Sequence, residues 1–376
     1  MIGHKRIPSR EGGVEIVVEE LSVRFAEKGC FVDAYNRSGY HVAGKEYDDV
    51  RYKDYKDVHI ITVPTFRNGK LNAIVYSVLA TIRALFRGYD VFHYHAEGPC
   101  IMLWLPRLFG KKIVATIHGL DWQRAKWGGF ATRMLKHGEK NAARYADEVI
   151  VLSKSMQKYF LETYGRKTVY IPNGISRPEK AEAREMIEKW GIQAYNYILF
   201  LARIVPEKGL HYLIEAYEKL DTDLKLVIAG GGSNAADYMA KIKKHAEENE
   251  KIIMTYFVQG RKLEELLSNA AFFVLPSDVE GMAISLLEAM SYGNCCIVSD
   301  IPENTEVVED HAVTFRKGDP EDLREKLEYL ITHPEEAAKY RENAAEFILS
   351  KHNWDRVAEE TLRVYRSVME GKPYEA

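Results

Sequence analysis

The segment Pro276–Tyr292, PSDVEGMAISLLEAMSY, carries the clearest fold signal in this chain. It follows an apolar run at 271–275 with the composition of a buried strand, and after a polar turn it continues with the apolar periodicity of a helix. A strand, a short loop and a helix start form an anion site, because the first N–H groups of a helix have no partner within it. Glu280 in the loop and Glu288 in the helix can accept hydrogen bonds from paired hydroxyls. This combination indicates a sugar-nucleotide site, and a buried strand–helix unit with solvated acids is the alternative.

Strand-like and helix-like runs alternate on both sides of this segment. In the first half, strands are expected at 30–36, 59–63, 91–94, 112–117, 148–152 and 168–171, and helices at 71–87, 98–109, 129–145 and 154–164. In the second half, strands are expected at 195–203, 224–229, 252–258, 271–275 and 295–299, and helices at 207–219, 262–268, 319–332, 334–349 and 354–370. This alternation predicts an α/β protein with two doubly wound, Rossmann-like domains.

The start of the chain and the domain boundary are less regular. Met1-Ile2-Gly3 is short for the first strand of a doubly wound sheet, so we expect a truncated strand or a start upstream of Met1. Pro172-Asn173-Gly174 ends the first half, and the polar, charged stretch after it places the boundary at about 175–195.

Length and composition agree with two globular domains. At 376 residues the chain exceeds what one hydrophobic core usually supports. It is 46% hydrophobic and 28% charged, and its four cysteines show neither metal-ligand spacing nor a disulfide framework, so we expect a reducing cytoplasmic setting. We find no apolar run long enough to span a membrane and no recognisable signal peptide.

Charge is distributed unevenly. Residues 1–175 carry 27 Lys and Arg against 18 Asp and Glu, whereas the remainder carries 25 against 37. Basic residues and tryptophans interleave at 122–144, which suits an anionic membrane surface or a lipid-linked pyrophosphate acceptor. A solvated helix with its tryptophans in the core is an equal alternative. Nucleic acid is disfavoured, because no binding module for it is visible.

Ligands of such sheets bind beyond the carboxyl ends of the strands, so polar residues there are candidates for function. In the first half, Gly12 and Gly13 open a helix and permit close approach of a phosphate or sugar to the backbone. His118 and Asp121 follow the strand at 112–117 and can hydrogen-bond a sugar hydroxyl or phosphate.

The second half offers cations at the same kind of position. Arg203 ends a strand and Lys208 stands five residues later, so both can converge with the amides of 282–285 on a diphosphate. Gly231 ends the next strand, where it permits a nucleotide to approach or makes a turn, and backbone near Val258 can pair with a base edge.

With these features, the chain resembles a retaining glycosyltransferase of family 4, which has the GT-B fold of two Rossmann-like domains facing each other. The most specific match is ARIVPEKG at 202–209 followed by PSDVEGMAISLLEAM at 276–290, the E-x7-E signature. IPSREGGVE at 7–15 and IHGLDWQRAKWGGF at 117–130 are similar to the branch that holds bacterial rhamnosyltransferases of surface polysaccharide synthesis.

The resemblance implies a division of the chain and a role for each candidate. It implies an acceptor-side domain at 1–175, a nucleotide-sugar-binding domain at 176–352, and a C-terminal helix and tail at 353–376 that pack toward the first domain. The implied roles are diphosphate binding for Arg203, Lys208 and Gly13, donor binding for Gly12, ribose binding for Glu288, and donor-sugar contact for Glu280 and His118. The amides of Met282, Ala283 and Ile284 would surround phosphate and sugar, and Asp121, Trp122 and Arg124 would contact the acceptor. Met282-Ala283 replaces the Phe-Gly usual in the family.

The implied reaction transfers a hexose or deoxyhexose, such as rhamnose, from a nucleotide donor to a saccharide or lipid-linked acceptor. Fixed cations and helix-start amides would stabilise the charge that grows on the departing diphosphate. No Asp-x-Asp motif lies in a loop suited to a metal, so we expect neither a metal nor another cofactor. A nucleotide-sugar epimerase and a catalytically disabled nucleotide-sugar binder remain alternatives.

Overall fold

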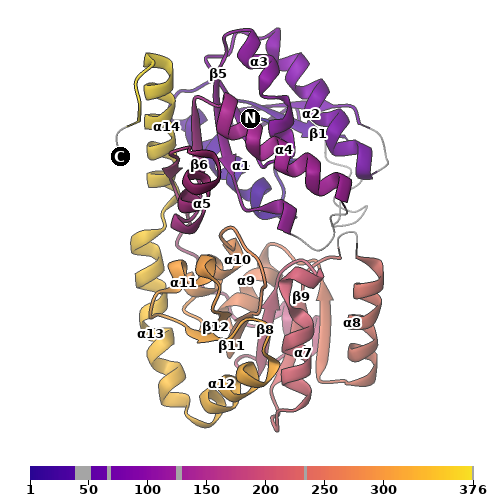
Figure 1. Cartoon of the computed structure of the whole chain (residues 1–376). Coiled ribbons are helices and arrows are strands. Elements are labelled where there is room, and N and C mark those ends of the chain that lie inside the picture. The colour runs from indigo at the N-terminus through magenta and orange to yellow at the C-terminus, as the bar shows by residue number, and fades with distance from the viewer. Residues whose placement is uncertain (39–51, 66–68, 124–128, 233–234, 375–376) are drawn as a thin grey trace. The chain divides into compact units, whose positions relative to one another are not determined.

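The computed structural model describes residues 1–38, 52–65, 69–123, 129–232 and 235–374. They form two compact units, and Figure 1 labels many of their elements. Unit 1 comprises Met1–Gly174 and Trp354–Ala376, and unit 2 comprises Ile175–Asn353.

Unit 1 contains a parallel sheet in two hydrogen-bonded parts. Their orders are β1-β3-β2 and β4-β5-β6-β7, and among the described strands only β2 pairs antiparallel. The strands are β1 (Asp33–Arg37), β2 (Asp54–Tyr55), β3 (Val58–Val63), β4 (Val91–His95), β5 (Lys112–Ile117), β6 (Glu148–Val151) and β7 (Val169–Tyr170). The helices are α1 (Gly13–Glu27), α2 (Gly69–Leu85), η2 (Pro99–Met102), α3 (Trp104–Leu108), η3 (Asp121–Gln123), α4 (Gly129–Tyr145), α5 (Lys154–Tyr164) and α14 (Trp354–Glu370).

The first residues of the chain join the two parts of this sheet. Ile2 forms a parallel bridge with Tyr94 of β4, and its N–H donates to the carbonyl of His93 at 2.9 Å. On the other side, the N–H of Tyr35 in β1 donates to the carbonyl of Met1 at 3.0 Å. The short segment therefore occupies the strand position between β1 and β4.

The C-terminal helix α14 belongs to unit 1 and packs on α1. Arg24 Nε of α1 donates to Asp355 Oδ1 of α14 at 2.7 Å, and the rings of Phe25 and Tyr365 meet edge to face with centroids 5.4 Å apart.

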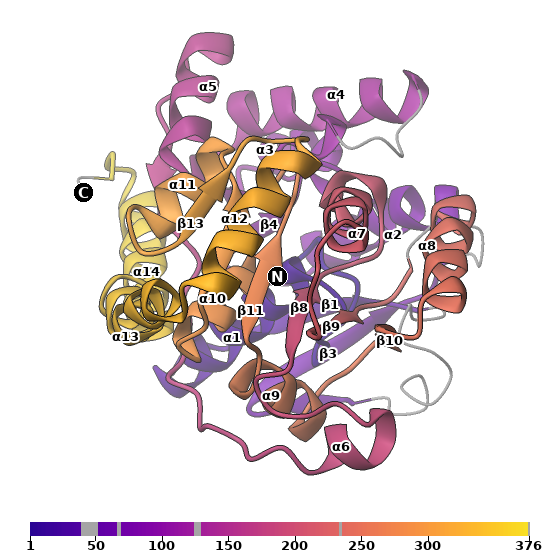
Figure 2. The ribbon, with the colours of Figure 1, turned by 90° about the horizontal axis from the view of Figure 1, so that it is seen from below.

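Unit 2 contains one six-stranded parallel sheet in the order β10-β9-β8-β11-β12-β13, which Figure 2 shows from below. The strands are β8 (Tyr197–Leu201), β9 (Lys225–Ala229), β10 (Ile252–Tyr256), β11 (Phe272–Leu275), β12 (Cys296–Ser299) and β13 (Val313–Phe315). The helices are α6 (Glu185–Trp190), η4 (Pro206–Lys208), α7 (Leu210–Glu218), α8 (Ala236–Glu248), α9 (Arg261–Ser268), α10 (Ile284–Ser291), α11 (Pro302–Val308), α12 (Pro320–Thr332) and α13 (Pro334–Lys351).

Both faces of this sheet are covered, as its continuous apolar strands predict. Alternate strand residues such as Ile198 and Phe200 form one core with α7, α8 and α12. The intervening residues, such as Leu199 and Phe273, are also fully buried.

The structure differs from the predicted elements in several places. The expected helix at 98–109 is divided into η2 and α3, and the expected strand at 252–258 ends at Tyr256, whose φ of 58° leaves the extended region. Helices α6, α8 and α11 and strands β2 and β13 were not expected, because they are short or mostly polar and their apolar periodicity is weak.

Candidate functional site

Two glycines fix the loops at the carboxyl edge of the unit 2 sheet. Gly209 has a φ of +67°, and a Cβ there would lie 1.9 Å from the carbonyl oxygen of Pro276. Gly230 has a φ of +149°, and a Cβ there would lie 1.8 Å from the carbonyl oxygen of Ala202. Because only glycine fits both positions, the loops after β8, β9 and β11 approach one another backbone to backbone.

Lys208 and Glu280 form an ion pair across these loops. Lys208 Nζ donates to Glu280 Oε1, and the two side chains are only 13% and 8% exposed. Ser277 Oγ donates to the same carboxylate oxygen at 2.7 Å. The structure therefore brings two of the predicted site residues together, with the ammonium group of Lys208 held by the carboxylate of Glu280.

The start of α10 lies beside Glu280 in the sequence. Ala283 precedes the helix in an extended conformation, and no side chain caps it. Met282, Ala283 and Ile284 are nearly buried, and Glu288 lies in the second turn with an exposed fraction of 8%. The helix start thus has the geometry that lets backbone amides face an anion.

The remaining donor candidates follow neighbouring strands. Arg203 is half-buried just beyond β8. The carbonyl of Gly231 accepts a hydrogen bond from the N–H of Ile204 at 3.0 Å, and Val258 is buried beyond β10. All of them follow carboxyl ends of parallel strands in one sheet, and so lie along one edge.

In unit 1, three histidines line the ends of β4 and β5. His95 Nδ1 lies 3.0 Å from His118 Nε2, and His93 Nε2 lies 2.7 Å from Thr116 Oγ1. His118 is half-buried, whereas the ring of His95 has no exposed surface. Burial, followed by the neighbouring imidazoles, lowers the pKa of His95 well below its ordinary value, so this ring is neutral at pH 7.

The predicted glycine loop of unit 1 already meets a carboxylate. Gly12 is the N-cap of α1, and a Cβ there would lie 2.4 Å from Glu15 Oε2. Glu15 Oε1 accepts a hydrogen bond from the N–H of Lys5 at 2.8 Å. A phosphate near Gly12 or Gly13 would share the helix start with this acid.

The structure describes two of the three acceptor-side candidates. Asp121 and Trp122 are half-buried in η3 after β5, and Arg124 lies outside the described residues. Trp122 Nε1 donates to Glu139 Oε2 of α4 at 3.0 Å, and Lys136 Nζ lies 4.0 Å from the indole centroid. The indole of Trp122 therefore contacts α4, which is incompatible with its insertion into a membrane in this conformation.

Comparison with known proteins identifies both halves. Residues 11–177 match the family model described as Glycosyltransferase Family 4, and residues 182–347 match the model described as Glycosyl transferases group 1. The two halves of this chain are glycosyltransferase domains. Their fold is the GT-B fold, with two Rossmann-like α/β domains.

Several relatives resemble this glycosyltransferase over its whole length. The alpha-maltose-1-phosphate synthase of Mycolicibacterium smegmatis is 27% identical over 96% of this chain and 97% of its own. The O-antigen chain mannosyltransferase C of Escherichia coli is 25% identical over 97% of both chains. The sucrose-phosphate synthase of Thermosynechococcus elongatus superposes with a TM-score of 0.81 at 21% identity, over 99% of this chain and 96% of its own. Anabaena HepE in complex with UDP-glucose superposes with a TM-score of 0.79 at 15% identity, over 97% of this chain and 98% of its own. The rhamnosyltransferase-like branch that the sequence suggested is not among these findings.

Glu207 of this glycosyltransferase is a site neighbour that the sequence analysis missed. Its side chain is 4% exposed, and neither carboxylate oxygen has a hydrogen-bond donor within the described residues. Its backbone carbonyl accepts from the N–H of Asp278 at 2.9 Å, which ties the 206–209 turn to the loop after β11. The only sequence signal was its position directly before Lys208.

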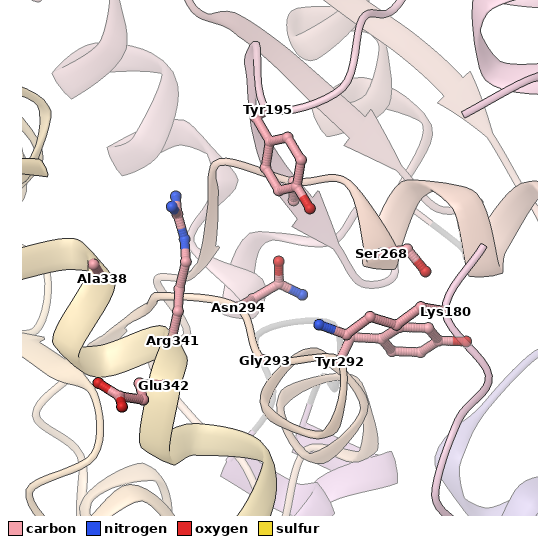
Figure 3. Close-up of a pocket in the computed structure, with 10 residues that line it drawn as sticks. Lys180, Tyr195, Ser268, Tyr292, Gly293, Asn294, Ala338, Arg341 and Glu342 are labelled. Atoms are coloured by element: carbon pink, nitrogen blue, oxygen red, sulfur yellow. The ribbon is translucent and has the colours of Figure 1, made fainter. Parts of the chain in front are cut away.

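A hollow of about 370 Å³ lies on the opposite edge of unit 2. Figure 3 shows Lys180 and Tyr195 extending toward Asn294, with Arg341 reaching in from α13. Tyr195 precedes β8 and Asn294 precedes β12, so the hollow lies at the amino ends of the strands. It is therefore separate from the edge that carries Arg203, Lys208 and Glu280.

In the described part of the glycosyltransferase, no helix is both long and apolar enough to cross a bilayer.

Proposed function

We propose that this glycosyltransferase is a retaining, metal-independent enzyme that moves a sugar from a nucleoside diphosphate to a saccharide or lipid-linked acceptor in glycan synthesis. The observation that carries the proposal is the Lys208–Glu280 pair beside the uncapped start of α10. Lys208 and the amides at the helix start suit the diphosphate of such a donor, whereas the carboxylates of Glu280 and Glu288 suit its sugar and ribose hydroxyls.

Donor binding would redistribute the charges of this edge. Lys208 would turn toward the diphosphate together with Arg203, while Glu280 would accept hydrogen bonds from sugar hydroxyls. Glu288, in the second turn of α10, would accept from the ribose.

The chemical step would depend on the same groups. As the bond to the leaving oxygen breaks, negative charge grows on the diphosphate, where Arg203, Lys208 and the amides of 282–285 stabilise it. Attack by the acceptor hydroxyl from the face of the departing phosphate retains the anomeric configuration, and the phosphate oxygen takes the hydroxyl proton. A UDP-sugar is the first donor to test, since HepE was crystallised with UDP and UDP-glucose.

A thermal-shift screen with UDP-, dTDP- and GDP-sugars tests donor binding. A ligand at 100-fold over its dissociation constant adds about 2.7 kcal/mol of stability, which is readily detected. The donor found is then incubated with and without acceptor and followed by NMR. Retained configuration in a new glycoside supports the proposal. Conversion of the donor to its epimer in the absence of acceptor would show that the protein is a nucleotide-sugar epimerase. Donor binding without any turnover would show that it is a nucleotide-sugar binder.

We also propose that unit 1 contacts an anionic surface through α4, at the inner face of a cytoplasmic membrane. Exposed basic residues recur along one face of this helix. They are Arg133, Lys136, His137, Lys140 and Arg144. Each lysine or arginine near an anionic membrane contributes about 1 kcal/mol. Because Trp122 contacts α4, the contact would be electrostatic and would not depend on that indole.

A further inference from the structure

Two buried glutamates lie beneath the loop that follows β5. Glu97, just after β4, and Glu139, on α4, both have no exposed surface. Glu139 is well supplied with donors: Oε2 accepts from Trp122 Nε1 at 3.0 Å, and Oε1 accepts from the hydroxyls of Tyr159, at 2.8 Å, and Tyr164. Neither oxygen of Glu97 has a side-chain donor among the described residues, and the group that can donate to it is the backbone N–H of Asp121.

The carboxyl group of Glu97 faces that of Glu139, where α4 packs against the segment after β4. A Cβ at Gly138 would lie 2.0 Å from the carbonyl oxygen of Glu97, so α4 rests directly on the backbone of Glu97. A second ionised carboxylate at this place would be a buried charge without a counter-charge. A protonated Glu97, in contrast, can donate its O–H to Glu139 and satisfy both groups.

We propose that Glu97 and Glu139 share one proton and act together as positioning residues for the loop 118–123. Glu139 holds the indole of Trp122 from one side while Lys136 lies over its face. Trp122 in turn fixes η3, which carries Asp121. The proposal rests on the proposed glycosyl transfer and deepens it, because it assigns the residues that hold the acceptor side of unit 1 in place.

The groups that face Glu97 agree with a neutral acid. They are Asp121 of η3, Glu139 of α4 and the thiol of Cys100 in η2. Burial first, and then the negative charges of Asp121 and Glu139, raise the pKa of Glu97. Burial also raises the pKa of the Cys100 thiol, which stays neutral. The stability that Glu97 contributes is therefore complete below the pKa of its unfolded form, and it decreases as pH rises toward the raised pKa of the folded form.

The Glu97→Gln variant tests the shared proton without relying on activity. Its amide is neutral at every pH and can donate to Glu139 as the acid does. The melting temperature of the variant relative to the wild type should therefore rise between pH 5 and 9, by roughly 2–4 °C or more. Glu265→Gln in unit 2 is the matched control: Glu265 Oε2 accepts from the N–H groups of Arg184 and Met186, and its pKa is lowered although burial opposes this. Because the Glu265 carboxyl is ionised in the folded and the unfolded protein above its ordinary pKa, the melting temperature of Glu265→Gln relative to the wild type should stay flat between pH 5 and 9. A flat difference for Glu97→Gln would overturn the shared proton.

Hydrogen–deuterium exchange of a peptide covering 113–123 tests the positioning role. Exchange should be about fivefold faster in Glu97→Ala and should return to the wild-type rate in Glu97→Gln. With UDP-glucose as donor and octyl β-glucoside as acceptor probe, Glu97→Ala should raise the KM for the acceptor about tenfold and leave the KM for the donor within twofold. Unchanged exchange in Glu97→Ala, or equal exchange in both variants, would overturn the positioning role. If no variant or wild type turns over, the proposed function fails while the exchange result still decides this proposal.

Discussion

His95 Nδ1 and His118 Nε2 lie 3.0 Å apart, and His95 is fully buried behind His118. A hydrogen bond between two imidazole nitrogens needs one N–H, so the tautomers of the two rings are linked. The neutral ring of His95 thereby orients His118 at the carboxyl edge of unit 1.

Replacing His95 by leucine should make the protein less sensitive to acid. The folded-state pKa of His95 is lowered, so its contribution to stability is present above the unfolded pKa of 6.5 and is lost as pH falls below it. The loss reaches about 1.4 kcal/mol per pH unit. Between pH 7.5 and 5.5, the melting temperature of the wild type should therefore fall further than that of the variant, as measured by scanning calorimetry. An equal loss in both proteins would mean that His95 does not titrate in this way.

Breaking the Lys208–Glu280 pair should destabilise unit 2 and weaken donor binding. Lys208→Ala leaves the Glu280 carboxylate almost buried without its cation, which costs about 3–5 kcal/mol in comparable pairs. The double variant Lys208→Met, Glu280→Gln removes both charges and should recover most of this stability. It should not recover donor affinity, because the ammonium is absent. Recovery of affinity in the double variant would remove Lys208 from the donor site.

Gly209→Ala should destabilise unit 2 far more than Gly191→Ala. Both residues have positive φ, at +67° and +63°, so both substitutions carry a backbone cost of about 1–2 kcal/mol. Only at Gly209 does the added Cβ meet a backbone atom, the carbonyl oxygen of Pro276. Urea unfolding of the two variants measures the difference in stability. Similar urea midpoints would show that the loops at Gly209 and Pro276 can move apart without loss of stability.

Reversing charge on α4 should weaken liposome binding. Arg133→Glu with Lys140→Glu should abolish most co-sedimentation with vesicles that contain phosphatidylserine, and binding should also fall with added salt. The control is Lys158→Glu on α5, an exposed lysine of the same unit. Equal binding of wild type and double variant, or no difference between anionic and neutral vesicles, would contradict the proposal.

The alternation of strands and helices was predictable because buried parallel strands are continuous apolar runs. It placed α4 at 129–145 and α5 at 154–164, where the structure has them. It also indicated that residues after strands gather at one edge, which groups Arg203, Lys208 and Glu280. Short or polar elements such as α6 and β13 were missed, since packing and not periodicity holds them.

The pairings within the site could not be predicted. Lys208 and Glu280 are 72 residues apart, and only the close approach at Gly209 brings their loops together. Glu97 and Glu139 were overlooked, because an acid in a loop or in a basic helix is usually solvated. Their burial depends on the contact between α4 and the backbone of Glu97, which leaves no local pattern in the sequence.

Calorimetric titration of the best donor from the thermal-shift screen tests the central claim most directly. The titration compares wild type, Arg203→Ala and Lys180→Ala, the last altering the hollow on the opposite edge of unit 2. We predict that Arg203→Ala weakens binding by about 1.5–3 kcal/mol, the usual value of a hydrogen bond to a charged group, and that Lys180→Ala leaves it unchanged. Wild-type affinity in Arg203→Ala, or a loss confined to Lys180→Ala, would show that the donor does not bind at the carboxyl edge of unit 2.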